Sequence, residues 1–324
     1  MKRLAMLVIA LTALPAIASG YEKRPEVKSF VREMVERHGF VENELLFLFS
    51  RTKKREPILQ AISPPGPGRG RSWSEYRAIF VNDRQVQGGS AFWKMHEQAL
   101  SRASKDYGVP EEIIVAIIGV ETLYGKNMGK WRVVDALTTL AFDYPPRAEF
   151  FRSELENFLV FSRDFGFDVF SVLGSYAGAI GIPQFMPSSY LKYAVDFDAS
   201  GVTDLRASPV DAIGSVGNFL KQHGWRAGEP IHFPATVSGE AWRPFADGTV
   251  LPKHPLTDMQ KAGVAFSGGA PATPGILIEL GNRDAGAEYR VGLQNFFVLT
   301  RYNRSSFYAS AVTDLAAALR AARR

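Results

Sequence analysis

The stretch Ile113–Asn127, IIVAIIGVETLYGKN, places a carboxylate at the end of an unusually apolar helical pattern. Pro110 and two glutamates precede it, as expected for the first turn of a helix, where proline is tolerated and acids interact favourably with the helix dipole. Isoleucines recur through the stretch at helical spacing and mark a buried face. Glu121 follows Ile117 by four residues and Ile114 by seven, so it falls on that buried face.

A charged carboxylate on a buried face costs free energy unless it is paired, hydrogen-bonded or protonated. Two interpretations of Glu121 are therefore open from this stretch alone. The first is a structural glutamate in an ion pair or at a helix end. The second is a catalytic acid whose pKa has been raised by burial. The choice depends on the rest of the chain.

The composition is that of an ordinary globular protein. The 324 residues are 46% hydrophobic and 22% charged, enough for one large domain or two to three small ones. The absence of cysteine excludes a disulfide scaffold, a thiolate metal site, a cysteine nucleophile and a lipid-anchoring cysteine. The histidines show no zinc spacing, and no phosphate loop is present. A net charge of +5 without a dense basic run does not support nucleic-acid binding, although it suits an anionic cell wall.

The first 18 residues are expected to be a cleaved signal peptide and not part of the fold. Lys2 and Arg3 form a basic start, Leu4–Leu14 an apolar core, and Ala16–Ala18 a small-x-small cleavage site. The apolar run is too short to span a membrane, and no other segment could do so. We therefore expect a periplasmic protein without a transmembrane segment, and we expect it to be a monomer.

Helical patterns fill most of the chain, and a short β-rich part interrupts them. In addition to the helix of the opening stretch, helical character is expected over about 26–59, 90–108, 146–166 and 208–224. Short alternating runs separated by Gly and Pro extend from 228 to 303 and predict strands. The predicted fold class is mainly α (α+β). The predicted parts are a signal peptide (1–18), a helical domain (19–105, joined by a C-terminal helix, 306–322), a catalytic core (106–227 plus 294–305) and a small β-rich domain (228–293).

Two further stretches accompany the helix of Glu121. Gly174–Tyr190, GSYAGAIGIPQFMPSSY, is dense in small residues that let a backbone approach a ligand closely, and it then carries amides, hydroxyls and rings. Hydrogen-bonding groups and flat rings are what a sugar-binding groove requires. Tight helix packing explains the same pattern and stays open. The second stretch is Leu299–Ser306, LTRYNRSS.

Four long stretches of the chain, taken in order, resemble one known family of proteins, and the resemblance is strongest from about 70 to 226. They are VPEEIIVAIIGVETLYGKNMGKWRVVDALTTLAFDYPPRAEFF, GSYAGAIGIPQFMPSSYLKYAVDF, DAIGSVGNFLKQHGW and NFFVLTRYN. Together they resemble the membrane-bound lytic murein transglycosylase B family, glycoside hydrolase family 103. The resemblance implies a lysozyme-like catalytic core with an additional helical domain and a small β-rich insertion. It also implies an enzyme that binds peptidoglycan glycan strands, cleaves the MurNAc–GlcNAc β-1,4 bond without water or a cofactor, and leaves a 1,6-anhydro-MurNAc end.

The resemblance assigns roles to single positions. Glu121 matches the family's one catalytic acid/base, and a glutamate on an apolar face is expected to have the raised pKa of a general acid. The implied substrate-binding residues are Tyr76, Phe150, Ser175, Gln184, Phe185, Phe219, Tyr302 and Asn303. Tyr302 and Asn303 are expected to close the cleft near Glu121. Phe150 and Phe219 stand where relatives can have tyrosine, so stacking is kept and a hydroxyl is lost. Core packing is the alternative for each ring.

Ordinary glycosidases use two carboxyl groups at a fixed separation. Asp135 and Asp143 follow Glu121 closely, but neither lies in a motif for a nucleophile. Assistance from the N-acetyl group of the substrate would make a second acid unnecessary. Two alternatives stay open, a hydrolytic muramidase that delivers water and a non-catalytic peptidoglycan-binding protein. Proteins of cell-wall synthesis or remodelling are the expected protein partners.

The run DFDASGVTD, which begins at Asp196, is similar to an EF-hand loop. Oxygen-bearing side chains recur on alternate residues and can surround one hard cation, while a glycine at position 6 permits the sharp turn. Position 12 is Ala207 instead of glutamate, and the resemblance to the family points to the later Asp211. Asp211 could equally serve the N-terminus of the next helix. A structural cation, calcium or another, is expected at Asp196, Asp198, Ser200, Asp204 and Asp211.

Overall fold

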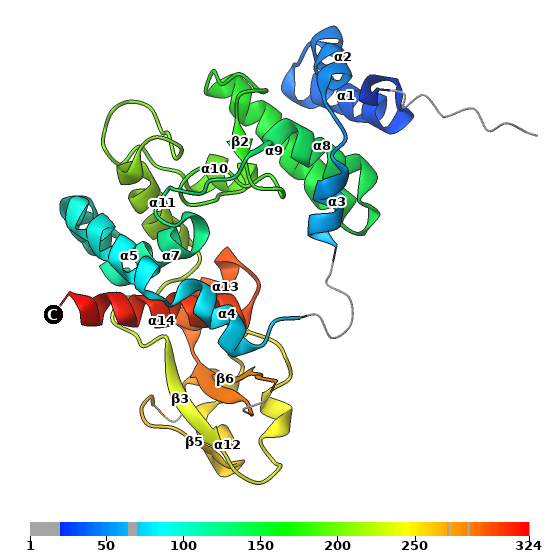
Figure 1. The fold of residues 1–324 in the computed structure, drawn as a ribbon. Helices are drawn as coiled ribbons and strands as arrows, with labels where there is room; N and C mark the ends of the chain where they lie inside the picture. The colour runs from blue at the N-terminus through cyan, green and yellow to red at the C-terminus, as the bar shows by residue number, and fades with distance from the viewer. Residues whose placement is uncertain (1–19, 64–69, 271, 284–285, 324) are drawn as a thin grey trace, which may run out of the picture.

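The computed structural model describes residues 20–63, 70–270, 272–283 and 286–323 and is mainly helical (Figure 1). The helices are α1 Pro25–His38, α2 Glu42–Arg51, α3 Glu56–Ile62, α4 Trp73–Phe80, α5 Asp83–Met95, α6 Glu97–Tyr107, α7 Glu111–Thr122, α8 Val133–Asp143, α9 Ala148–Asp164, α10 Pro187–Tyr193, α11 Pro209–Gln222, α12 Leu256–Lys261, α13 Gln294–Tyr302 and α14 Ser306–Ala322. The predicted signal peptide, 1–18, lies outside the described residues. Within them, no helix is both long and apolar enough to cross a membrane.

The strands are short and form two sheets. They are β1 Trp131–Arg132, β2 Leu173–Gly174, β3 His232–Val237, β4 His254–Pro255, β5 Val264–Ala265, β6 Pro274–Leu280 and β7 Glu288–Gly292, and the one-turn 3₁₀ helices are η1 Tyr21–Lys23, η2 Pro145–Arg147 and η3 Arg243–Phe245. β1 pairs with β2, and the other five form an antiparallel sheet in the order β4-β6-β7-β3-β5. The predicted β-rich part is thus a single small sheet with its own apolar cluster.

The helical character expected over 26–59 is present, and it is divided into α1, α2 and α3. Gly39 ends α1 in the left-handed conformation at φ +68°, which glycine adopts without a steric penalty. Thr52–Arg55 then separates α2 from α3. These three helices lie beside α8 and α9, as Figure 1 shows. A buried Asp135 on α8 fixes them there by accepting hydrogen bonds from Arg55 at 2.9 and 2.6 Å.

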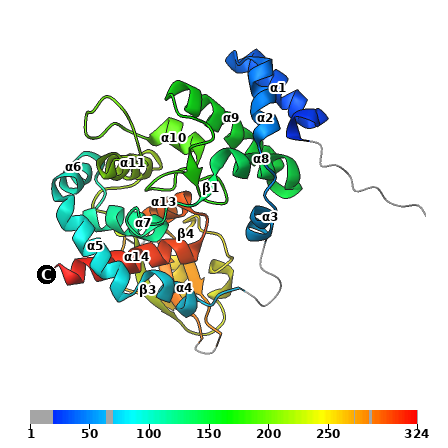
Figure 2. The same cartoon turned by 45° about the horizontal axis from the view of Figure 1, so that its top comes forward.

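The helix of the opening stretch, α7, lies at the centre of the second group of helices. It packs against α5, α6, α11 and α14 (Figure 2). Seven consecutive residues from 113 to 119 are buried, so the helix contacts neighbours on all sides. The predicted limits of the helical domain, 19–105, stay a prediction. Residues 19–105 contact two different parts of the molecule. Helices α1–α3 lie beside α8 and α9, whereas α4 and α5 pack on α14.

The strand-like pattern at the end of the β-rich part misled the prediction for 294–303. Strand β7 ends at Gly292, and Gln294–Tyr302 forms helix α13. Its aromatic and β-branched residues favour strands locally. However, Asn295, Phe296, Leu299 and Thr300 are buried at helical spacing, and this burial against the core decides the conformation.

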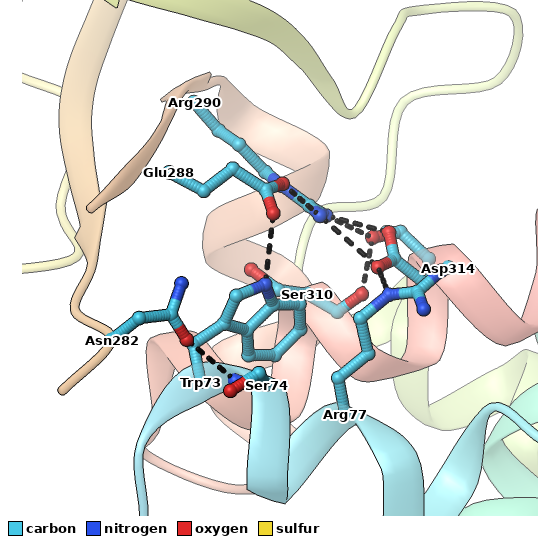
Figure 3. A network of polar contacts seen from close by, with 9 residues as sticks. Trp73, Ser74, Arg77, Asn282, Glu288, Arg290, Ser310 and Asp314 are labelled. Atoms are coloured by element: carbon cyan, nitrogen blue, oxygen red, sulfur yellow. Dashed lines mark hydrogen bonds and ion pairs between the residues drawn. The ribbon is translucent and has the colours of Figure 1, made fainter. Parts of the chain in front are cut away.

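A network of ion pairs joins the small sheet to the helical body (Figure 3). Arg290 on β7 is buried and pairs with Glu288 at 2.5 Å and with Asp314 on α14 at 2.8 Å. Trp73 on α4 donates its indole N–H to Glu288 at 2.9 Å, and Arg77 donates to Asp314 at 2.6 Å. Buried ion pairs contribute little net stability but fix relative positions. The network therefore sets where α14 lies.

Candidate active site

Glu121 lies in the last turn of α7, where the helix ends abruptly. Leu123 and Tyr124 both have positive φ, at +50° and +61°, and Gly125 follows at +83°. Two consecutive non-glycine residues in this region cost free energy, and such strain persists where the surrounding structure imposes it, often at functional sites. Thr122 holds the turn, because its hydroxyl donates to the carbonyl of Ile182 at 2.8 Å and accepts from the Gly125 N–H at 2.9 Å.

One tyrosine from the C-terminal helix contacts the carboxylate directly. The Tyr308 hydroxyl on α14 donates to Glu121 Oε1 at 2.7 Å, and the Tyr308 side chain is only 2% exposed. The ring of Tyr302, at the end of α13, stacks on Tyr308 with centroids 6.3 Å apart and planes 14° apart. The Tyr302 hydroxyl donates to the carbonyl of Pro183 at 2.6 Å. Helices α7, α13 and α14 and the segment at 183 thus converge on one carboxylate.

The surroundings of Glu121 change its acidity. Burial raises the pKa of this half-buried glutamate from its ordinary 4.5 to about 7, and the hydrogen bond from Tyr308 opposes that rise. Burial, followed by the nearby Glu121 charge, raises the pKa of both Tyr308 and Tyr302 well above the ordinary value. The pKa of Tyr76 is raised in the same way, first by burial and then by the Glu121 charge. Tyr76 therefore lies within electrostatic range of the carboxylate.

No second carboxylate of the described residues shares this site. Two factors move the pKa of Glu121 from its ordinary value, its burial and the Tyr308 hydroxyl, and no neighbouring acid contributes. Asp135 is bound by Arg55 and Arg132, at 2.6 and 3.1 Å. Asp143 is bound by Arg24 at 2.9 Å and by the hydroxyl of Tyr21 at 2.5 Å. Both aspartates are engaged in structural contacts.

The Gly-rich segment forms tight turns that are closed by its own polar groups. The Ser175 hydroxyl accepts from the Ala179 N–H at 3.0 Å. Gln184 has φ +53°, and its side-chain amide donates to the carbonyls of Gly181 at 2.8 Å and Met128 at 3.2 Å. Gln184 therefore ties this segment to the loop that follows α7. The exposed Asn303 comes directly after Tyr302 at the end of α13.

The predicted rings fall into two groups. Phe185 and Phe219 are 2% and 5% exposed and contact Tyr302, with centroid separations of 5.9 and 4.8 Å. Their contacts support the core-packing interpretation, with an indirect role in holding Tyr302. Phe150 on α9 is 39% exposed, and its cation–π and ring contacts are with Arg147 and Phe151. Phe150 is thus placed outside the group of rings around Glu121.

The predicted cation loop brings part of its ligand set together. Carboxylate oxygens of Asp196, Asp198 and the buried Asp211 lie within 4.8 Å of one another. Ser200 is adjacent, since its backbone N–H donates to Asp196 at 3.0 Å and to Asp198 at 3.1 Å. Asp204 instead pairs with Arg206 at 3.2 Å. Three clustered carboxylates fit a hard, oxygen-binding cation.

Sequence reasoning missed Tyr308, although one signal was present. Tyr308 lies four residues before Val312 and seven before Leu315 in the predicted C-terminal helix, so it falls on the same apolar face as these two residues. A tyrosine on a buried face requires a partner for its hydroxyl. That requirement could have marked Tyr308, but nothing in the sequence identifies Glu121 as the acceptor.

Comparisons with known proteins identify the family of this chain. The family model described as Transglycosylase SLT domain matches residues 22–317. The chain belongs to this family. The membrane-bound lytic murein transglycosylase B of Escherichia coli (strain K12) is 41% identical over 315 residues, which cover 94% of this chain and 85% of that protein. The family membership predicted from the sequence is therefore confirmed.

Solved structures of family members share the fold. The soluble lytic transglycosylase SltB1 from Pseudomonas aeruginosa is 47% identical, with a TM-score of 0.86 over 92% of this chain and 99% of that chain. The Escherichia coli lytic transglycosylase Slt35 in complex with calcium is 41% identical, with a TM-score of 0.83 over 93% of this chain and 94% of that chain. The predicted fold class, mainly α with a lysozyme-like catalytic core, is confirmed by this family membership.

Proposed function

We propose that this protein is a lytic transglycosylase that cleaves the MurNAc–GlcNAc β-1,4 bond of peptidoglycan and forms 1,6-anhydro-MurNAc ends. The observation that carries the proposal is a single half-buried carboxylate, Glu121, with a pKa of about 7 and a tyrosine donor at 2.7 Å. The substrate is inferred from the family and from the relatives that are named murein transglycosylases. Glu121 is the proposed catalytic residue, and the predicted substrate-binding residues stay proposals.

In the first step Glu121 acts as the general acid. Its proton moves to the glycosidic oxygen as the bond from that oxygen to C1 of MurNAc breaks. The carbonyl oxygen of the substrate's N-acetyl group attacks C1 and takes the place of the enzyme nucleophile that a retaining glycosidase provides. The ion pairs that occupy Asp135 and Asp143 support this route, because neither carboxylate is free to attack.

In the second step the same carboxylate acts as the base. Glu121, now ionised, takes the proton of the C6 hydroxyl while that oxygen attacks C1 and displaces the N-acetyl oxygen. No water is consumed, and Glu121 is again protonated. The C6 hydroxyl is tethered to the reacting sugar, so its effective concentration exceeds that of a diffusing water by a wide margin. A pKa near 7 suits both steps, because the group must first donate a proton and then accept one.

Tyr308 and Tyr302 have supporting roles in this scheme. The Tyr308 hydroxyl orients the carboxylate and stabilises its ionised form between the two steps. The ring of Tyr302 stacks on Tyr308, and its hydroxyl donates to the Pro183 carbonyl, so Tyr302 connects Tyr308 to the Gly-rich segment. Ser175, Gln184, Asn303 and Tyr76 are the proposed contacts to the sugar.

We further propose that Asp196, Asp198 and Asp211 hold a structural calcium ion. The solved Slt35 from Escherichia coli was obtained in complex with calcium, and the three clustered carboxylates of this chain suit such an ion. The ion would neutralise the carboxylates and brace the loop before α11. The ion would have no part in the chemistry, because catalysis is assigned to Glu121.

We propose the periplasm as the site of action, which follows from the substrate and from the signal-peptide pattern in 1–18. The product test distinguishes the proposal from a hydrolytic muramidase. Sacculi digested in ¹⁸O-labelled water should yield unlabelled 1,6-anhydro ends, each one water lighter than the hydrolysed species. Labelled reducing ends would identify a hydrolase. Binding without release of muropeptides would identify a non-catalytic wall-binding protein.

A further inference from the structure

A row of rings and guanidinium groups connects helix α2 to strand β1, and the proposed chemistry does not use it. The row consists of Phe47 and Arg51 on α2, Phe170 in the turn after α9, and Arg132 on β1; we call it the Arg51 strip. The Arg51 guanidinium lies 5.8 Å from the ring centre of Phe47 and 5.1 Å from that of Phe170. The Arg132 guanidinium lies 5.3 Å from the Phe170 ring. Cation–π contacts thus connect all four side chains.

The strip is open to solvent at its outer end. Phe47 is 63% exposed, and Arg51 is exposed beside it. Among the ion pairs of the described residues, neither Arg51 nor the nearby exposed Lys53 takes part in one. A single exposed ring is ordinary. A large exposed ring held against an unpaired guanidinium combines apolar surface with free positive charge, which indicates a surface suited to an anionic ligand with small apolar groups.

The charge of the strip stays positive after its acidic neighbours are counted. Asp135 is shared by Arg132 and Arg55, so two cations meet one carboxylate. Two more negative charges come from Asp168, which accepts from the Phe170 N–H at 3.0 Å, and from Glu44, one helical turn before Phe47 on α2. Arg51 and Lys53 add two further positive charges. The net charge attracts anions, and salt would weaken that attraction.

The strip continues into the proposed sugar-binding segment. Arg132 on β1 pairs with Leu173 on β2, and Leu173 is 49% exposed. The next pair along this small sheet is Trp131 with Gly174, directly before Ser175. Figure 2 shows β1 between α7 and α8. A polymer held at Ser175 and Glu121 would therefore have the Arg51 strip beside it.

We propose that the Arg51 strip binds the peptide stems of peptidoglycan while the glycan strand is held at Glu121. This inference rests on the proposed function. The stems carry free carboxylates, which guanidinium groups bind with good geometry, and alanine methyl groups, which suit the exposed ring of Phe47. The glycan offers mainly hydroxyl and acetamide groups, which do not require unpaired cations. The strip thus recognises the stems, and the Glu121 site recognises the sugars.

The test uses two substrates and a matched control. The substrates are intact sacculi and sacculi whose stem carboxylates have been converted to amides, which keeps the glycan and removes the negative charge. The variants are Arg51→Ala and Arg84→Ala. Arg84 is also an exposed arginine without an ion pair among the described residues, but it lies on α5. Phe47→Ser is a second strip variant that removes the ring and keeps every charge.

Arg51→Ala should lower kcat/KM on intact sacculi by up to about fivefold, the upper end of the range for an exposed charge contact. The loss should appear in KM and not in kcat, and it should vanish on amidated sacculi and at high salt. Phe47→Ser should lower kcat/KM on both substrates, and Arg84→Ala on neither. Equal losses for Arg51→Ala on both substrates, or no loss on either, would reject the strip as a stem site. If the wild type released no anhydro ends from either substrate, the proposed function itself would fail.

Discussion

Glu121→Gln should make the folded protein more stable, and the gain should increase with pH. The reason is the raised pKa of Glu121. When a group binds its proton more tightly in the folded state than in the unfolded state, the free energy of unfolding of the protein falls as pH rises. Below about pH 4.5 the carboxyl is neutral in both the folded and the unfolded state, so the substitution changes little. Between 4.5 and about 7 the unfolded chain ionises first, and the wild type is progressively destabilised. Glutamine carries no charge and escapes this cost.

The rise in pKa from 4.5 to about 7 sets the size of the effect. At about 1.36 kcal/mol per pKa unit, the full difference would be about 3.4 kcal/mol above pH 7. Glu121 is half-buried, so solvent screens part of this cost, and we expect about 1–2 kcal/mol. The glutamine carbonyl can still accept the hydrogen bond from Tyr308. For a chain of this size the gain corresponds to a rise in Tm of about 1.5–3 °C.

The assay is thermal unfolding of wild type and Glu121→Gln in matched buffers from pH 4 to pH 8.5. Glu36→Gln, an exposed glutamate on α1, controls for the loss of one negative charge. The difference in Tm between wild type and Glu121→Gln should be near zero at pH 4 and reach its maximum above pH 7. A difference that stays constant across this range, or that shrinks as pH rises, would refute the buried-acid argument.

Three further predictions follow from the site. Glu121→Gln should release muropeptides at less than about a tenth of the wild-type rate, because an amide cannot transfer the proton, and a faster release would exclude Glu121 as the catalyst. Tyr308→Phe removes the hydrogen bond that favours the ionised carboxylate, so the alkaline limb of the kcat/KM profile should move up by about one pH unit; an unchanged or lowered limb would contradict the assigned contact. Asp196→Ala should lower Tm in calcium but not in chelator, and equal wild-type Tm values in both would remove the cation site.

The sequence was sufficient wherever a pattern was local and strong. The apolar run of α7 predicts a buried helix. The sequence Ser208-Pro209 is typical of a helix start, and the Ser208 side chain does cap α11 by accepting from the Asp211 N–H at 3.1 Å. Both features depend on residues a few positions apart. The break of 26–59 into three helices, by contrast, depends on Gly39 and on the packing against α8. Amphipathic periodicity alone does not record such a break.

Contacts between distant parts of the chain could not be predicted in the same way. Tyr308 reaches Glu121 across 187 positions, and only the packing of α14 on α7 brings them together. The prediction of strand for 294–303 failed for a related reason, because burial of one face of α13 overrides local β-propensity. The resemblance to the family identified Tyr302, but the stacking of Tyr302 on Tyr308 is a fact of three-dimensional packing.

The position of Glu121 at the end of α7 suits one group that must act as both acid and base. Burial at the end of this apolar helix raises its pKa. The hydrogen bond from the Tyr308 hydroxyl lowers it. A carboxyl with burial alone would hold its proton too tightly to serve as the donor, and one with strong hydrogen bonding alone would be ionised before the first step. The balance near 7 therefore depends on the contact that α14 supplies, and the Arg290–Asp314 ion pair helps to hold that helix in place.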